Sequence, residues 1–174
     1  MKMFLCLTAS LFSISAFAEN SIFEAAKSGD LMTVKQILGN KRELLNSSDE
    51  KGYTALIYAA YYGQEEIVTY LLKSGADACA KDKRGNTATL GAIFKGHLGI
   101  AKTLMKTKCG INQPNEVGQT PLMFASLFGR SEIAQELIKS GADTTKSDAQ
   151  GNTATSLAEG QGNQEMVKIL ERKK

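Results

Sequence analysis

The stretch from Asp49 to Lys81 reads DEKGYTALIYAAYYGQEEIVTYLLKSGADACAK, and its main features return every 33 residues along the chain. An acidic or amide residue, two glycines and a threonine each occur four times in phase. These positions are Asp49, Asp82, Asn115 and Asp148; Gly52, Gly85, Gly118 and Gly151; Thr54, Thr87, Thr120 and Thr153; and Gly63, Gly96, Gly129 and Gly162. A period of this length is typical of a solenoid, whose units bury their apolar faces by stacking on one another.

Within one unit, the pattern predicts a turn followed by two helices. Gly52 falls in the turn, where a positive φ is expected, and Thr54 can cap the helix that follows. Gly63 ends this first helix. The apolar residues between Ile67 and Leu72 then form the stripe of a second helix. We therefore predict an all-α fold made of stacked helix-turn-helix units.

The chain resembles the ankyrin repeat family over nearly all of its length after residue 18. The Thr-Pro-Leu-His opening of the family's first helix is similar to residues 120–123, which read TPLM, and to residues 54–57, which read TALI. The Gly-Ala-Asp ending occurs at residues 75–77 and 141–143. Repeat three has Lys-Cys-Gly at residues 108–110 instead, so a different loop geometry is expected there.

The resemblance implies a solenoid of about five repeats with short β-turn fingers. Their expected bounds are about 19–48, 49–81, 82–114, 115–147 and 148–174, with the first and last repeats as polar caps.

Residues 1–18 have the features of a secretory signal peptide. Lys2 gives a positive start, an uncharged run follows, and Ala16-Phe17-Ala18 is a small-x-small cleavage pattern. The apolar run is shorter than the roughly 20 residues that a membrane-spanning helix needs. Cys6 lies inside the run without small residues before it, which argues against a lipoprotein. We expect export, cleavage after Ala18 and a periplasmic repeat domain over 19–174 without a membrane anchor.

The charge and chemistry of the chain favour binding over catalysis. The chain has 21 basic and 18 acidic residues, a net charge of +3, which gives no argument for nucleic acid. Its one histidine, His97, follows Gly96 at the start of a second helix, where a structural hydrogen bond is favoured over general-base chemistry. The glycines of the turns and helix ends belong to the repeat, so they indicate no phosphate-binding loop. We expect no enzymatic activity, no cofactor and no metal site.

Two cysteines remain after the predicted cleavage, Cys79 and Cys109, and disulfides persist in exported proteins. Both lie in loops that leave second helices of adjacent repeats. Their positions within the repeat differ, however, and stacked helices lie about 10 Å apart. That separation is too long for a disulfide unless the irregular third loop bends toward the second. The sequence leaves open whether the two cysteines pair.

By the resemblance, ankyrin proteins bind partners with the turn tips and the exposed side of the first helices. Aromatic residues stand just before the glycine that ends this helix in three adjacent repeats, and basic residues lie nearby. The candidate partner-binding residues are Tyr53, Tyr61, Tyr62, Lys83, Arg84, Phe94, Lys95, Gln119, Leu127 and Phe128. Either these rings pack between repeats or they anchor a protein partner, and the second reading is favoured. The basic residues, with Lys81, suit either an acidic groove on a partner or a solvated edge.

Three functions remain as hypotheses. In size, leader and repeat number the chain is similar to exported ankyrin proteins that protect predatory bacteria from their own secreted peptidoglycan DD-endopeptidases, which implies a monomer that blocks such a hydrolase sterically in a heterodimer. Other exported ankyrin proteins accompany catalases, which implies a scaffold or accessory factor. Direct binding of anionic cell-wall glycan by the basic residues is the third.

Overall fold

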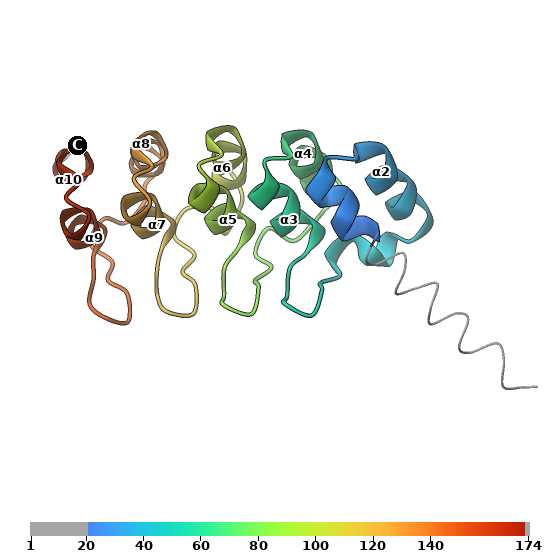
Figure 1. Cartoon of the computed structure of the whole chain (residues 1–174), viewed down its shortest axis with the longest axis horizontal. Helices are drawn as coiled ribbons and strands as arrows, with labels where there is room; N and C mark the ends of the chain where they lie inside the picture. Colours follow the sequence, from blue (N-terminus) through green and yellow to red (C-terminus); the bar gives the residue numbers. More distant parts are fainter. Residues whose placement is uncertain (1–20, 173–174) are drawn as a thin grey trace, which may run out of the picture.

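The structure is a computed structural model that describes residues 21–172, so the predicted signal peptide at 1–18 lies outside the described residues. The described part is a row of paired helices (Figure 1). A helix over residues 21–28 comes first, followed by α2 (Leu31–Asn40) and the 3-10 helix η1 (Arg42–Asn46). Four helix pairs follow: α3 (Ala55–Tyr62) with α4 (Glu65–Lys73), α5 (Ala88–Lys95) with α6 (Leu98–Met105), α7 (Pro121–Leu127) with α8 (Ser131–Lys139), and α9 (Ala154–Gly160) with α10 (Gln164–Glu171).

The prediction of an all-helical repeat solenoid is confirmed. Residues 21–172 contain no β-strand, and their extended pairing is limited to two isolated bridges, Ser48 with Thr54 and Ser147 with Thr153. None of the helices in this range is long and apolar enough to cross a membrane. In Figure 1 the helices α3, α5, α7 and α9 form one row, α4, α6, α8 and α10 form a second row, and the loops that precede the first row project from it as fingers.

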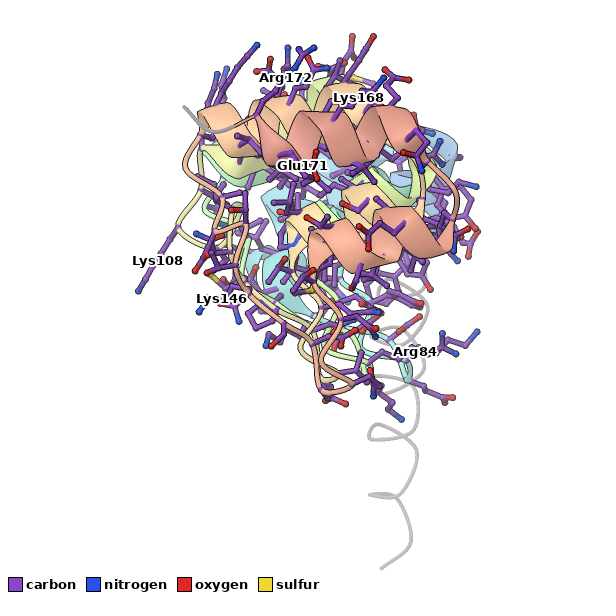
Figure 2. The ribbon with its side chains drawn as sticks, turned by 90° about the vertical axis from the view of Figure 1, so that its left-hand side faces the viewer. Arg84, Lys108, Lys146, Lys168, Glu171 and Arg172 are labelled. Atoms are coloured by element: carbon purple, nitrogen blue, oxygen red, sulfur yellow. A yellow bond between two sulfur atoms is a disulfide. The ribbon has the colours of Figure 1, made fainter. Side chains whose placement is uncertain are left out.

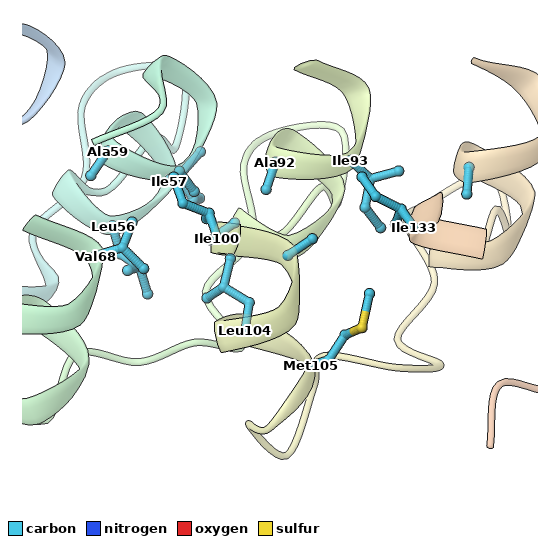
Figure 3. Packing of buried hydrophobic residues seen from close by; sticks show 14 of the residues in the cluster. Leu56, Ile57, Ala59, Val68, Ala92, Ile93, Ile100, Leu104, Met105 and Ile133 are labelled. Atoms are coloured by element: carbon cyan, nitrogen blue, oxygen red, sulfur yellow. The ribbon is translucent and has the colours of Figure 1, made fainter. Parts of the chain in front are cut away.

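The same apolar positions fill the core between successive repeats. The first helices bury an alanine at each step of 33, and these small side chains let neighbouring helices lie close together. The second helices bury a large apolar residue and a leucine at each step. The sets are Ala59, Ala92, Ala125 and Ala158; Ile67, Ile100, Ile133 and Met166; and Leu71, Leu104, Leu137 and Leu170. Figure 3 shows Ile57 beside Ile100 and Ile93 beside Ile133, and the buried cluster extends from Ile22 to Leu170, so the core runs the length of the row.

The aspartate or asparagine that begins each repeat closes its finger. In repeat three, Oδ1 of Asp82 accepts hydrogen bonds from the backbone N–H groups of Arg84 and Asn86 at 2.8 Å. Asn115 makes the equivalent two bonds in the next finger, at 3.2 and 2.9 Å. The glycine of the turn takes a positive φ, 76° at Gly85, a conformation that L side chains rarely adopt. These residue types are therefore explained by turn geometry.

Backbone hydrogen bonds join each finger to the next. The N–H of Lys83 donates to the carbonyl of Lys51 at 2.9 Å, and the N–H of Glu116 donates to the carbonyl of Arg84 at 3.1 Å. The fingers therefore form a continuous edge without strands, and their side chains are held in register from repeat to repeat.

Cys79 and Cys109 form a disulfide between the loops that follow α4 and α6. Their Cα atoms lie 5.3 Å apart, within the range that a disulfide spans. The loop after α6 differs from the others because Gly110 packs directly against the Leu104 carbonyl and Met105, where a Cβ atom would clash. The irregular loop of repeat three therefore brings Cys109 within disulfide distance of Cys79.

Replacing Asp82 with alanine should lower the free energy of unfolding by about 1–3 kcal/mol, because two backbone N–H groups of the finger lose their acceptor. Asp82→Asn is the matched control and should lose less, because its Oδ1 keeps both backbone bonds, as Asn115 does in the next finger, and loses only the bond from the Asn86 side chain to Oδ2. Urea unfolding followed by circular dichroism measures both. Equal losses for the two variants would show that charge matters in this finger more than the acceptor.

The hydrogen bonds of the Asp49 carboxylate should make the free energy of unfolding depend on pH. Burial acts to raise its pKa, but hydrogen bonds from the Tyr58 hydroxyl and from the N–H groups of Tyr53 and Lys51 outweigh burial and lower the pKa below its usual value. The folded chain therefore binds this proton more weakly than the unfolded chain does. The stabilisation is complete above about pH 5 and is lost as the pH falls through the lowered pKa.

In Asp49→Asn, the free energy of unfolding should fall less steeply between about pH 5 and pH 2 than in the wild type, as measured by urea unfolding at each pH. Glu132→Gln, which removes an exposed carboxylate from α8, is the control and should keep the wild-type slope. The same slope in Asp49→Asn and wild type would contradict the role given to Asp49.

The disulfide closes a loop with a sequence separation of 30 residues, and its removal should destabilise the protein by about 3–4 kcal/mol on the chain-entropy account. Denaturant unfolding with and without reductant measures this loss. A Cys79→Ser/Cys109→Ser variant should match the reduced wild type and should not respond to reductant. A reduced wild type as stable as the oxidised form would contradict the prediction.

Candidate functional site

Aromatic side chains from successive first helices meet in one row. The rings of Tyr61 and Phe94 are stacked, with centroids 5.9 Å apart and planes at 18°. Phe94 and Phe128 meet edge to face at 4.7 Å, and Tyr61 and Tyr62 meet at 5.3 Å. Four of the predicted rings, from three repeats, are therefore in mutual contact. We call the row the aromatic ladder; its members are Tyr53, Tyr58, Tyr61, Tyr62, Phe94, Phe124 and Phe128.

Two members of the ladder, Tyr58 and Phe124, were missed by the sequence analysis. Tyr58 lies 5.1 Å from the ring of Tyr53, and Phe124 lies 5.6 Å from the ring of Phe128. A usable signal was present, because each stands four residues before another ladder ring and so shares its helix face. The sequence prediction took only the residues just before the glycine that ends the first helix, and so it did not include these two rings.

The ladder rings pack on each other and still present surface to solvent. Tyr62 is 51% exposed and Phe94 is 37% exposed, whereas Tyr53, Tyr61 and Phe128 are partly buried. Exposed aromatic surface of this kind is what protein interfaces use as anchors. The two sequence readings, packing and binding, are thus compatible in one arrangement.

Three adjoining hollows follow the ladder, of about 270, 280 and 330 Å³. The first two share Tyr53, Ile57 and Tyr61, and the second and third share Arg84, Asn86 and Phe124. Together they make a continuous groove between the first helices and the fingers, which we call the ladder groove. Among the predicted site residues, Gln119 and Lys83 line its far end, while Leu127 is half-buried and lines none of these three hollows.

Side chains from the following repeat hold the backbone of the ladder in place. Nε2 of His97 lies 3.2 Å from the carbonyl oxygen of Tyr61, and Nη2 of Arg130 donates to the carbonyl of Phe94 at 2.7 Å. His97 also packs against Gly63, which takes a positive φ of 81°. The histidine therefore has a structural contact at the end of the first helix. Residues 21–172 contain no cluster of three or more His, Cys, Asp or Glu side chains that could hold a metal ion.

The predicted basic residues divide into two kinds. Arg84 lines two of the hollows, and Lys95 places its Nζ 5.1 Å from the centroid of the Tyr61 ring, within cation–π range. Lys81 instead donates a hydrogen bond to the Pro114 carbonyl at 3.2 Å. Figure 2 shows Arg84 on the opposite side of the fingers from Lys108 and Lys146. The groove side and the disulfide side of the molecule are therefore distinct.

Tyr58 lies at the end of the ladder groove that is nearest the first repeat. Its hydroxyl donates a hydrogen bond to Asp49, and its ring lies 4.3 Å from Nζ of Lys27. Burial, followed by the bond to Asp49, raises the pKa of Tyr58 far above its usual value. The ring is thus a neutral, rigid part of the groove wall.

Comparison with known proteins agrees with this architecture. A family model described as ankyrin repeats (3 copies) matches residues 22–115 and 92–174. Human NAD-capped RNA hydrolase NUDT12 is 45% identical over 53 residues, which is 30% of this chain and 12% of that protein. Human DNA-binding protein RFXANK is 42% identical over 57 residues, 33% of this chain and 22% of that protein. Human ankyrin repeat domain-containing protein 39 is 41% identical over 63 residues, 36% of this chain and 34% of that protein.

These matches span about a third of this chain and from about an eighth to a third of the relatives. This chain therefore covers only part of the length of each of these relatives. Ankyrin repeats are generally protein-binding modules without catalysis of their own. From its repeat period, its stacked helix pairs and the family match over most of its length, this chain belongs to the ankyrin repeat family.

Proposed function

We propose that this protein is an exported binding module that holds a partner protein in the ladder groove. The observation that carries the proposal is the aromatic ladder itself, a row of mutually packed rings with Tyr62 and Phe94 exposed along a groove. Rings already held by their neighbours lose little side-chain entropy on binding, so their burial by a partner contributes efficiently to affinity.

Two features support action outside the cytoplasm. Residues 1–18 have the pattern of a cleavable signal peptide. The Cys79–Cys109 disulfide suits an oxidising compartment such as the periplasm. With its groove and a resemblance to self-protection proteins, the chain suits a periplasmic inhibitor whose fingers and ladder rings enter the substrate cleft of a secreted peptidoglycan DD-endopeptidase and exclude its substrate.

To test the inhibitor function, the purified protein serves as bait in a periplasmic extract, and bound proteins are identified by mass spectrometry. A peptidoglycan hydrolase is expected, and its release of fragments from purified peptidoglycan should stop at equimolar protein. Recovery of a catalase with unchanged hydrolase activity would contradict inhibition and leave the binding function intact. Sedimentation of the protein with peptidoglycan alone would contradict a protein partner.

Tyr62→Ala and Phe94→Ala should each weaken partner binding by about 2 kcal/mol, which is about 30-fold in Kd, as measured by isothermal titration calorimetry. The free energy of unfolding should change little in Tyr62→Ala, and it should fall by about 1 kcal/mol in Phe94→Ala, because Phe94 also packs on Tyr61 and Phe128. Met32→Ala is the matched control, because Met32 on α2 is 74% exposed and lies outside the three hollows of the groove. Equal affinity in wild type and both ring variants would show that the partner binds another face.

A further inference from the structure

Gly91 interrupts the aromatic row of the first helices. The equivalent residues in the other repeats are Tyr58, Phe124 and Leu157. Glycine is the least favourable residue in a helix interior after proline, and Gly91 lies within α5. The nearest atoms to a Cβ at this position would belong to Tyr61, at 3.8 Å, which is an ordinary contact distance, and Gly91 does not take a positive φ. Neither tight packing nor backbone conformation requires this glycine.

The space that a side chain at position 91 would fill belongs to the middle hollow of the groove, about 280 Å³ in volume. Phe94 and Phe124 line it beside Gly91, and both are ladder rings. We call this hollow the Gly91 pocket. Its volume lies just below the range of about 300–1,000 Å³ of small-molecule sites, which suits one large side chain better than a cofactor.

The threonine at the start of α5 differs from its equivalents in the other repeats. In α3, α7 and α9 the threonine at the start of the helix accepts a bond from a backbone N–H group. Thr87, the equivalent residue in α5, makes no such bond, and its hydroxyl is fully buried without a partner. Thr87 lines the pocket. The hydroxyl of Thr89 is also unpaired but belongs to a residue outside the pocket lining. The hydroxyl has no accessible surface, so it marks a difference between α5 and the other first helices and offers no bond to an occupant.

The exposed charged group in the lining of the pocket is a cation. Arg84 lines the pocket and is exposed. Within residues 21–172 the ion pairs are Lys27–Glu24, Lys102–Glu136 and Lys139–Glu136, so Arg84 takes part in none. The one carboxylate in the lining, Asp82, is occupied by hydrogen bonds from Arg84 N–H, Asn86 N–H and the Asn86 side chain. A guanidinium in this position pairs best with a carboxylate of an occupant.

We infer that the Gly91 pocket receives one large apolar side chain from an extended acidic segment of a partner protein, whose carboxylate pairs with Arg84. The inference rests on the proposed binding function and names the specificity pocket within the same groove. An apolar residue with Asp or Glu one or two positions away is the recognised feature. Gly91 leaves the wall of this hollow without a side chain where the neighbouring repeats carry Tyr58 and Phe124, so a side chain added at position 91 should exclude the occupant.

The test uses a phage-displayed library of random 12-residue peptides, selected on the purified wild-type protein. Peptides with Leu, Ile, Met or Phe close to Asp or Glu should be enriched. The most enriched peptide is then synthesised and its Kd measured by fluorescence anisotropy. Gly91→Leu, which fills the pocket, and Arg84→Glu, which reverses the charge, should each weaken binding at least tenfold. Gly39→Leu adds the same side chain to α2 at an open site and should stay within twofold of wild type.

Circular dichroism checks that each variant is folded, and Gly91→Ala with Arg84→Glu carries the test if Gly91→Leu does not fold. No enrichment, enrichment of basic peptides, or equal binding by wild type and Gly91→Leu would overturn the inference. Binding that Tyr62→Ala weakens but Gly91→Leu leaves unchanged would overturn the pocket alone and retain the groove as a binding face. If neither Tyr62→Ala nor Gly91→Leu affects binding, the result would contradict both the pocket and the groove as the binding site.

Discussion

Each helix pair has an apolar face that it cannot cover by itself, and the rest of the structure follows from covering it with the next pair. The buried alanines of the first helices and the isoleucines and leucines of the second recur at one step because every interface between repeats is the same interface. The same step of 33 residues also sets the positions of the finger turns and helix ends outside the core. Residues that are equivalent in sequence become neighbours in space, one repeat apart.

The aromatic ladder is a product of that alignment. Tyr61 and Phe94 occupy positions 33 residues apart, and their rings stack because their helices do. The hydrogen bonds from His97 and Arg130 to the carbonyls beneath these rings, and the bonds between fingers, restrict how far the repeats can slide. The groove therefore combines a rigid backbone with rings that pack on their neighbours and keep part of their surface exposed.

Departures from the repeat are the informative positions, because a solenoid needs no departure to fold. Repeat three carries two of them, Gly91 in its first helix and the Cys109 loop after its second. Gly91 lines a pocket on the groove side, and Cys109 is bonded to Cys79 on the loops that leave the second helices. The disulfide thus ties repeat three to repeat two, whose rings form one wall of the groove.

The sequence by itself determined the repeat length, the helix pairs, the finger turns and most of the ladder residues, because these depend on short-range patterns that the period repeats four times. Only the tertiary structure decided the rest. Whether Cys79 reaches Cys109 depends on how one irregular loop packs on α6, and the roles of Tyr58, Phe124 and Gly91 depend on which helix face turns toward the fingers. Leu127 stands beside Phe128 in sequence yet lines none of the three hollows, because adjacent residues on a helix point about 100° apart.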